Sequence, residues 1–212
     1  MKRRVLIASL GSILAVWPLR AAGQTATTQN WPAHPVKLIV GFAPGGPTDL
    51  IARLVAQKLT EQTGKNFFVE NVSGAGGNVG AVRAAKSSPD GYTFLVTGGN
   101  ITNNPYLFAE PGYDPLKDFD AVTLAAATPV VLAVNPSVPA TSVKELVVWI
   151  HANPGKESYA SPGTGTPPQL VGALFQHALQ LDLVHVPFDG GGTAMQATVG
   201  GHTSAQWRLR CR

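Results

Sequence analysis

The chain has 212 residues, of which 16 are basic and 12 acidic, and its formal net charge is +4. Residues 1–23 hold four of the basic residues and no acidic ones, so residues 24–212 carry 12 of each. Three of these 12 basic residues lie within the last five positions of the chain. The remainder forms no basic patch with interleaved aromatic residues, so nucleic acid is not an expected partner.

The N-terminus has the three-part layout of a secretory signal peptide. Lys2, Arg3 and Arg4 precede the apolar run VLIASLGSILAVW, and the small residues Ala21–Gly23 follow it. A single-pass anchor is the alternative, but the run is shorter than the ~20 residues that span a bilayer. We therefore expect residues 1–23 to be a signal peptide, cleaved after Gly23, on an exported protein. Cys211 is the only cysteine, so no internal disulfide is expected.

The first half of the chain alternates strand-like and helix-like segments. Apolar residues at helical spacing from Leu50 to Leu59 predict a helix that ends at Gly64. Strands and helices that alternate across glycine turns are typical of a parallel sheet covered by helices. The other expected elements are strands at 36–41, 67–70 and 92–97, a glycine turn at 74–77 and a short helix through Val82 and Ala85.

The same rhythm returns after a proline-containing segment, 102–117, that we expect to be irregular and to lead into a connector between two lobes. Ser142 and Glu145 have the spacing of a capping box, which predicts a helix that runs to about His151. The remaining predictions are strands at 122–126, 130–134, 158–161 and 184–186, the turn PGTGTPP at 162–168, a helix at 169–179 and a glycine turn at 190–192.

Several catalytic and cofactor motifs are absent. The turn FAPGGPTD lacks the lysine of a phosphate loop, and GAGGNVG is one residue too long for a dinucleotide turn. Neither Ser73 nor Ser161 lies in the G-x-S-x-G pattern of a serine hydrolase. The five histidines have no compact metal-ligand spacing. We therefore predict no catalytic residue, no metal site and no cofactor.

The glycine turns that precede helices remain as candidate binding elements. A helix N-terminus presents backbone N–H groups and the positive end of the helix dipole, which suits an anion. Asp49 is the only ionisable residue of the first turn, and its simplest role is to complement that dipole. If Asp49 instead faced the ligand, it would repel a carboxylate and attract an ammonium group, which would favour amino acids. Asp189 presents the same two alternatives in the second half of the chain.

Seven blocks of sequence, in order, resemble the periplasmic solute-binding receptors of tripartite tricarboxylate transporters, also called the Bordetella uptake gene family. They cover nearly all of the chain from residue 31 to about 202. The blocks are WPAHPVKLIVGFAPGGPTD (31–49), VENVSGAGGNVGA (69–81), PDGYTFLV (89–96), YDPLKDF (113–119), NPSVPATSVKEL (135–146), ANPGKESYASPGTGTP (152–167) and VHVPFDGGGTAM (184–195).

The resemblance implies an α/β, two-lobed periplasmic-binding-protein-like fold of type II that closes on a small organic acid. Its first lobe would span residues 24–123, and a partial second lobe would span residues 124–206. Backbone groups and waters in the first-lobe turns would hold a carboxylate, and second-lobe turns would face the rest of the ligand. The implied ligand-binding residues are Phe42, Ala43, Gly46, Thr48, Asp49, Gly98, Asn100, Ser161, Gly163, Thr164, Gly165, Thr166, Phe188 and Asp189.

The chain also departs from the family pattern. Pro162 and Gln169 stand where the family often has serine and histidine, and Phe188 stands where tyrosine is common, which removes one possible hydrogen bond to a ligand. After His202 the family continues into a buried strand, further second-lobe structure and a return to the first lobe. Here the chain reads TSAQWRLRCR. We therefore expect an incomplete second lobe, a missing return segment and a divergent basic tail at 207–212. A frameshift would explain the tail, and a genuine basic tail is the alternative.

These observations predict a monomeric, non-enzymatic, periplasmic receptor that captures a di- or tricarboxylate or a related acid. Its expected partners are the small carboxylate and the membrane components of a tripartite transporter. The alternatives are an exported α/β enzyme that acts on a carboxylate substrate, and a truncated or non-functional remnant.

Overall fold

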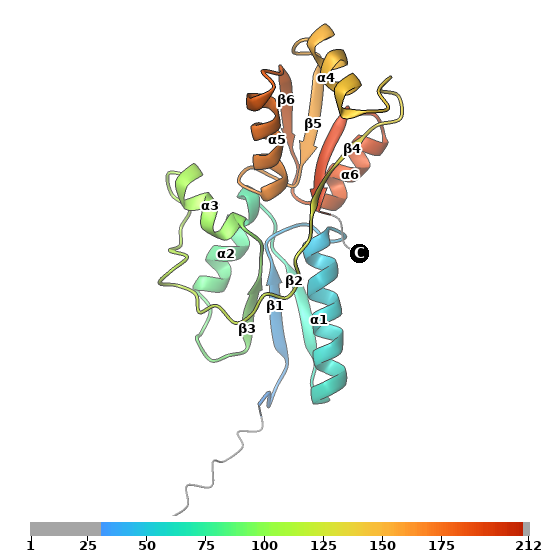
Figure 1. Ribbon diagram of the computed structural model, residues 1–212. Coiled ribbons are helices and arrows are strands. Elements are labelled where there is room, and N and C mark those ends of the chain that lie inside the picture. Colours follow the sequence, from blue (N-terminus) through green and yellow to red (C-terminus); the bar gives the residue numbers. More distant parts are fainter. Residues whose placement is uncertain (1–30, 210–212) are drawn as a thin grey trace, which may run out of the picture. The chain divides into compact units, whose positions relative to one another are not determined.

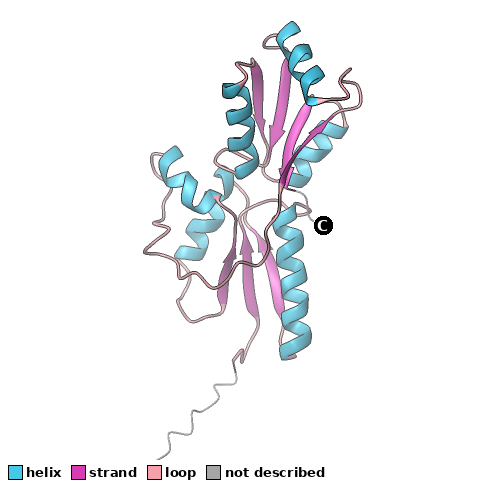
Figure 2. Ribbon diagram, in the orientation of Figure 1, coloured by secondary structure: helices cyan, strands magenta, loops and turns pink. Residues whose placement is uncertain are grey.

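The computed structural model describes residues 31–209, and the predicted signal peptide at 1–23 lies outside them. From Pro32 onward these residues belong to one compact unit, which contains two sheets with helices packed against them (Figure 1, Figure 2). Within residues 31–209 no helix combines the length and the hydropathy required to cross a bilayer.

The first lobe is built on a parallel sheet of three strands in the order β2-β1-β3. Alternate residues of the central strand, Val36, Leu38 and Val40, are buried among side chains that include Ala52 and Ala56 of the first helix. The elements are β1 (Val36–Val40), α1 (Pro47–Thr63), β2 (Phe67–Asn71), the 3-10 turn Ala75–Gly77, α2 (Asn78–Ala85), β3 (Thr93–Val96) and α3 (Asn100–Leu107).

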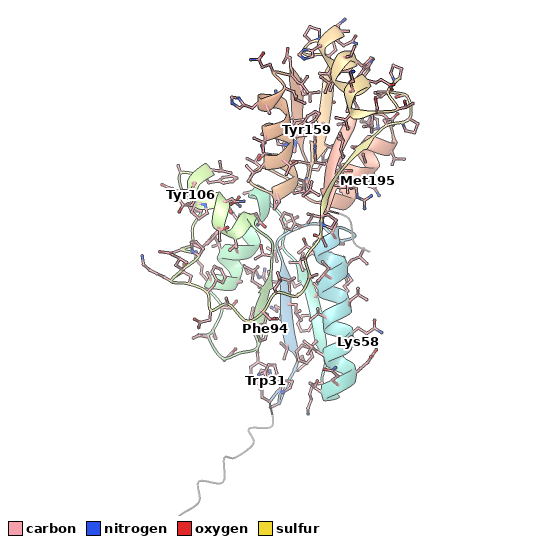
Figure 3. All side chains as sticks on the ribbon, viewed as in Figure 1. Trp31, Lys58, Phe94, Tyr106, Tyr159 and Met195 are labelled. Carbon is pink, nitrogen blue, oxygen red and sulfur yellow. The ribbon has the colours of Figure 1, made fainter. Side chains whose placement is uncertain are left out.

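The second lobe has a four-stranded sheet in the order β4-β7-β5-β6, in which β4 alone runs antiparallel to its neighbour. Its core combines aliphatic residues with two buried aromatic ones, Tyr159 (labelled in Figure 3) and Trp207. Their rings meet edge to face, with centroids 5.0 Å apart, and Phe175 packs beside them. The elements are β4 (Val130–Val134), α4 (Val143–Ala152), β5 (Glu157–Ser161), α5 (Pro167–Ala178), β6 (Leu183–Pro187), α6 (Gly191–Val199) and β7 (Ala205–Leu209).

Local sequence signals account for most of these boundaries. Gly64 ends α1 in the left-handed conformation, with φ of 67°. The capping box at the start of α4 is confirmed, because the Glu145 N–H donates to the Ser142 hydroxyl at 3.2 Å. Glu145 also accepts from the Thr141 N–H at 2.7 Å, so its carboxylate satisfies a backbone amide just ahead of the helix.

The prediction of an irregular segment at 102–117 is wrong for its first part, where α3 continues to Leu107 with Pro105 inside it. Proline lacks the N–H that would bond the carbonyl four residues earlier, which is that of Ile101. The hydroxyl of Tyr113 donates to this carbonyl at 3.1 Å. The lost helical hydrogen bond is therefore replaced from outside the helix, and Tyr113 itself is buried.

The predicted strand at 122–126 is also wrong. Val122 and Leu124 are 73% and 81% exposed, and neither pairs with a described strand. An apolar run becomes a strand only where a neighbouring strand satisfies its backbone groups. This run instead forms the start of the connector that leads to β4, whose prediction at 130–134 is confirmed.

The end of the described chain differs most from expectation. Residues 207–209, set apart above as the start of a basic tail, belong to β7, which pairs with both β4 and β5. Trp207 is 4% exposed and lies in the second core, which explains why this strand is held in the sheet. The glycine turn predicted at 190–192 is partly helical, because Gly191 and Gly192 are the first two residues of α6.

Candidate functional site

A small cavity lies where the carboxyl ends of several strands meet the N-termini of four helices. Its volume is about 50 Å³. Because one water needs at least ~10–15 Å³ on this scale, the cavity has room for roughly three to five waters. The lining residues are Phe42, Gly46, Pro47, Thr48, Gly98, Asn100, Pro162, Thr166, Pro167, Pro168, Gly191, Arg208 and Leu209.

Asp49 organises the first-lobe turn from outside the cavity lining. Its side chain is 4% exposed, and its Oδ2 accepts hydrogen bonds from the Gly45 N–H and the Arg53 Nε, each at 2.9 Å. Its Oδ1 accepts from the Asn71 amide at 2.9 Å, and the same amide also reaches the Phe42 carbonyl at 3.0 Å. The carboxylate therefore fixes the loop between β1 and α1, and it does not line the cavity.

The charge of Asp49 is stabilised in place by these contacts. Burial alone would raise the pKa of this carboxyl, but hydrogen bonds from Arg53, Gly45 and Asn71 hold its pKa below the ordinary value. With both oxygens engaged, Asp49 has a structural role, and this geometry gives no support to the alternative in which it attracts an ammonium group.

Asn100 and Asn104 connect the third strand to the glycine turn of the first lobe. Asn100 is 2% exposed; its Oδ1 accepts from the Gly98 N–H at 3.2 Å, and its amide donates to the Gly76 carbonyl at 3.1 Å. The Asn104 amide reaches the same carbonyl at 3.2 Å and bonds Asn78 Oδ1 at 2.5 Å. Asn100 thus lines the cavity as a fixed part of its wall.

The second-lobe turn is held by a pair formed by a buried serine and a half-buried histidine, which the sequence analysis did not find. Ser161 Oγ lies 2.7 Å from His185 Nε2 and accepts from the Gly163 N–H at 3.2 Å. Burial lowers the pKa of His185, which favours the neutral ring and lets the serine hydroxyl donate to it. Ser161 is fully buried and does not line the cavity, so the pair serves to position the turn.

The turns of the two lobes meet backbone to backbone beside the cavity. The Ala43 N–H donates to the Asp189 carbonyl at 2.9 Å. A Cβ placed on Gly46 would lie 3.3 Å from the Gly191 nitrogen. A Cβ placed on Gly76 would lie 2.1 Å from the Thr164 carbonyl oxygen, so only glycine fits this position. The turns of the two lobes can therefore approach this closely only because glycine, which has no side chain, stands at the points of contact.

The structure divides the predicted site residues into two groups. Those that line the cavity are Phe42, Gly46, Thr48, Gly98, Asn100 and Thr166. Those that lie outside its lining are Ala43, Asp49, Ser161, Gly163, Thr164, Gly165, Phe188 and Asp189. In the second group, Asp189 is exposed, Gly163 approaches Gly76, and the Phe188 N–H bonds the Ser161 carbonyl at 2.9 Å. Its members shape or support the turns.

The cavity also contains residues that the sequence analysis missed. Three of them are Pro162, Pro167 and Pro168, the prolines of the turn PGTGTPP, whose glycines and threonines alone are among the predicted site residues. Arg208 was missed because its segment was interpreted as a tail. The available signal that this segment is a strand was the alternation of apolar Ala205, Trp207 and Leu209 with polar residues.

The electrostatics of the cavity favour a negatively charged ligand. The N-termini of α1, α3, α5 and α6 contribute Thr48, Asn100, Thr166 and Gly191 to its lining, and helix N-termini favour anions. Arg208 is the only ionisable side chain among the described lining residues. Within residues 31–209, no three His, Cys, Asp or Glu side chains gather as metal ligands.

Two α/β lobes whose helix N-termini surround one cavity define a protein of the periplasmic-binding-protein-like class. The sequence profile of the tripartite tricarboxylate transporter family receptor matches residues 51–208. The chain therefore belongs to this receptor family, as the ordered sequence blocks predicted.

Solved structures agree with this assignment. A structure described as a periplasmic transporter is 42% identical, with a TM-score of 0.79, and the match covers 84% of this chain and 60% of that one. A Rhodopseudomonas palustris protein solved with adipate is 33% identical, with a TM-score of 0.82 and coverage of 84% and 60%. MatC of the same organism, solved with malate, is 31% identical, with a TM-score of 0.76 and coverage of 84% and 61%.

Curated relatives share the family but are longer. BugT of Bordetella pertussis is 32% identical, in a match that covers 94% of this chain and 61% of BugT. A UPF0065 protein of Agrobacterium vitis is also 32% identical, in a match that covers 95% of this chain and 56% of the relative. The chain thus spans somewhat more than half the length of the relatives that it matches.

Proposed function

We propose that this protein captures a small organic carboxylate in the periplasm and presents it to the membrane components of a tripartite transporter. The observation that carries the proposal is the cavity at which four helix N-termini and Arg208 converge, with no acidic side chain in its described lining. A carboxylate would be held by backbone N–H groups and one guanidinium, both of which are donors suited to an anion.

The nature of the ligand follows from the size and lining of the cavity. A volume of about 50 Å³, which is room for roughly three to five waters, favours the smallest acids over longer ones. Phe42, Leu209 and the lining prolines supply apolar contacts for its carbon chain. Two relatives were solved with adipate and with malate, and of these two acids the four-carbon malate is the better match to so small a cavity.

The test is ligand binding by the purified chain, measured by thermal unfolding and by calorimetry. Malate, succinate and adipate are compared with succinamide, which has the length of succinate without its charge. A ligand present at a hundred times its Kd stabilises the folded state by about 2.7 kcal/mol. For a chain of this size that is a rise in Tm of roughly 5–10 °C.

Four outcomes separate the alternatives. A rise in Tm with carboxylates but not with succinamide supports the receptor. A cooperative transition that no carboxylate shifts would overturn the proposal, and the lack of any cooperative transition would identify a remnant. Turnover of an added carboxylate, followed by NMR, would instead establish an enzyme. Fractionation of cells that express the chain tests the periplasmic location.

A further inference from the structure

Arg208 is an unpaired cation in the wall of the cavity. No described residue forms an ion pair with it, although five other lysine and arginine side chains of residues 31–209 are paired. The two aspartates of the neighbouring turns do not compensate it, because Asp49 is bonded to Arg53 and Asp189 is exposed outside the lining. A partly buried charge without a partner is costly, and an anion in the cavity would relieve that cost.

Strand β7 fixes the side of the sheet from which Arg208 projects. Trp207 points into the second core, so its neighbours Gln206 and Arg208 lie on the opposite face. The Gln206 amide reaches the carbonyl of Gly191 at the start of α6, at 3.5 Å, which confirms that this face is turned toward α6. Ala160 pairs with Gln206, so continuing the register by two residues places Arg208 beside Pro162, which also lines the cavity.

Helix α5 of the second lobe offers few backbone donors to the cavity. Helix α5 begins with Pro167 and Pro168, neither of which has an N–H group. Both prolines line the cavity, so this helix N-terminus presents ring carbons where two amides would otherwise point. The first lobe lacks only one such amide, at Pro47, and retains that of Thr48. Arg208 therefore adds a positively charged donor to a cavity wall in which one helix N-terminus lacks two of its amides.

We infer that Arg208 is a specificity-determining residue that binds a second anionic group of the ligand. It makes the cavity select short dicarboxylates over monocarboxylates of the same length. One carboxylate would lie at the first-lobe turn and the other at the guanidinium, with the carbon chain between them against the prolines and Phe42. The inference rests on the proposed function, since it concerns the same cavity.

The test compares succinate with butyrate, which has the same four-carbon chain and one carboxylate fewer, by calorimetry at low salt. The unaltered chain is expected to bind succinate at least tenfold more tightly, because a hydrogen bond to a charged group changes affinity by about ten- to a hundredfold. Arg208→Gln should remove this preference by weakening succinate at least tenfold and butyrate by less than threefold. Arg208→Lys should restore part of it.

The matched control is Arg83→Gln, which removes the same charge on α2, where Arg83 is paired with Glu70 outside the cavity lining. It should leave both affinities unchanged. Equal binding of succinate and butyrate by the unaltered chain would overturn the inference without the use of any variant. Retention of the succinate preference in Arg208→Gln would also overturn it, and in both cases the proposed receptor function would stand. Absence of binding to every acid would instead overturn the proposed function.

Discussion

Replacement of Asp49 by asparagine tests whether this carboxylate builds the first-lobe turn. Three donors converge on its two oxygens, from Gly45, Arg53 and Asn71. Asparagine has a single acceptor oxygen, so either Asn71 or the pair of Gly45 and Arg53 must face an amide NH₂ group instead. The substitution keeps the shape of the side chain and removes both its charge and one half of its accepting capacity.

The expected cost follows from these contacts. A hydrogen bond to a charged group contributes about 1.5–3 kcal/mol, whereas an exposed ion pair contributes about 0.2–1 kcal/mol. Arg53 is 52% exposed, so its ion pair with Asp49 is expected to contribute only the smaller amount, about 0.2–1 kcal/mol. We expect Asp49→Asn to lower the free energy of unfolding by about 2–4 kcal/mol at pH 7. For a chain of this size the Tm should fall by roughly 5–15 °C.

The pH dependence provides the sharper signature. The pKa of Asp49 is lowered in the folded state, so its stabilising contribution is fully present above the unfolded value of about 3.9. That contribution is lost as the pH falls through the lower folded pKa, where the carboxylate becomes protonated. The stability gap between the unaltered chain and Asp49→Asn should therefore be constant from about pH 6 to 8 and narrow below about pH 4.

Urea denaturation followed by circular dichroism at a series of pH values measures this gap. The control is Asp120→Asn in the exposed connector, which should change the free energy of unfolding by less than about 0.5 kcal/mol. A gap below 1 kcal/mol at pH 7, or one of unchanged size at pH 3, would refute the structural role assigned to Asp49.

Two further substitutions test the contacts between turns and the irregular helix. Gly76→Ala places a Cβ 2.1 Å from the Thr164 carbonyl oxygen and should weaken carboxylate binding, measured by calorimetry, at least tenfold. The control is Gly64→Ala, because Gly64 has a similar positive φ but no atom within 4 Å of the added Cβ; it should leave binding unchanged. Tyr113→Phe leaves the Ile101 carbonyl without its donor and should lower the free energy of unfolding by about 1–3 kcal/mol in urea denaturation.

Elements that depend on local chemistry were predictable from the sequence. The helix α1 was recognised from its apolar spacing and its glycine stop, and α4 from its capping box, because these signals lie within a few residues of each other. The predicted irregular segment failed for the converse reason. Pro105 is tolerated in α3 because Tyr113, eight residues further along the chain, bonds the carbonyl that the proline leaves free.

The same division separates the site residues. Phe42, Gly46 and Thr48 follow a predicted strand directly and open a predicted helix, so their place in the cavity could be anticipated. The pairing of Ser161 with His185 depends on the alignment of β5 with β6, and the place of Arg208 depends on the insertion of β7 between β4 and β5. Neither arrangement can be predicted from a short motif, since each depends on the pairing of strands that are far apart in the sequence.

Strand β7 links the stability of the second lobe to the charge of its cavity. Trp207 and Arg208 are adjacent, so the sheet directs one into the core and the other to the opposite face, where Arg208 lines the cavity. A register slip of one residue would exchange them and place a guanidinium among Tyr159 and Phe175. Burial of an unpaired charge there is far costlier than exposure of an indole, so packing of the tryptophan holds the arginine in place. The core thus determines where the cavity carries its single positive charge.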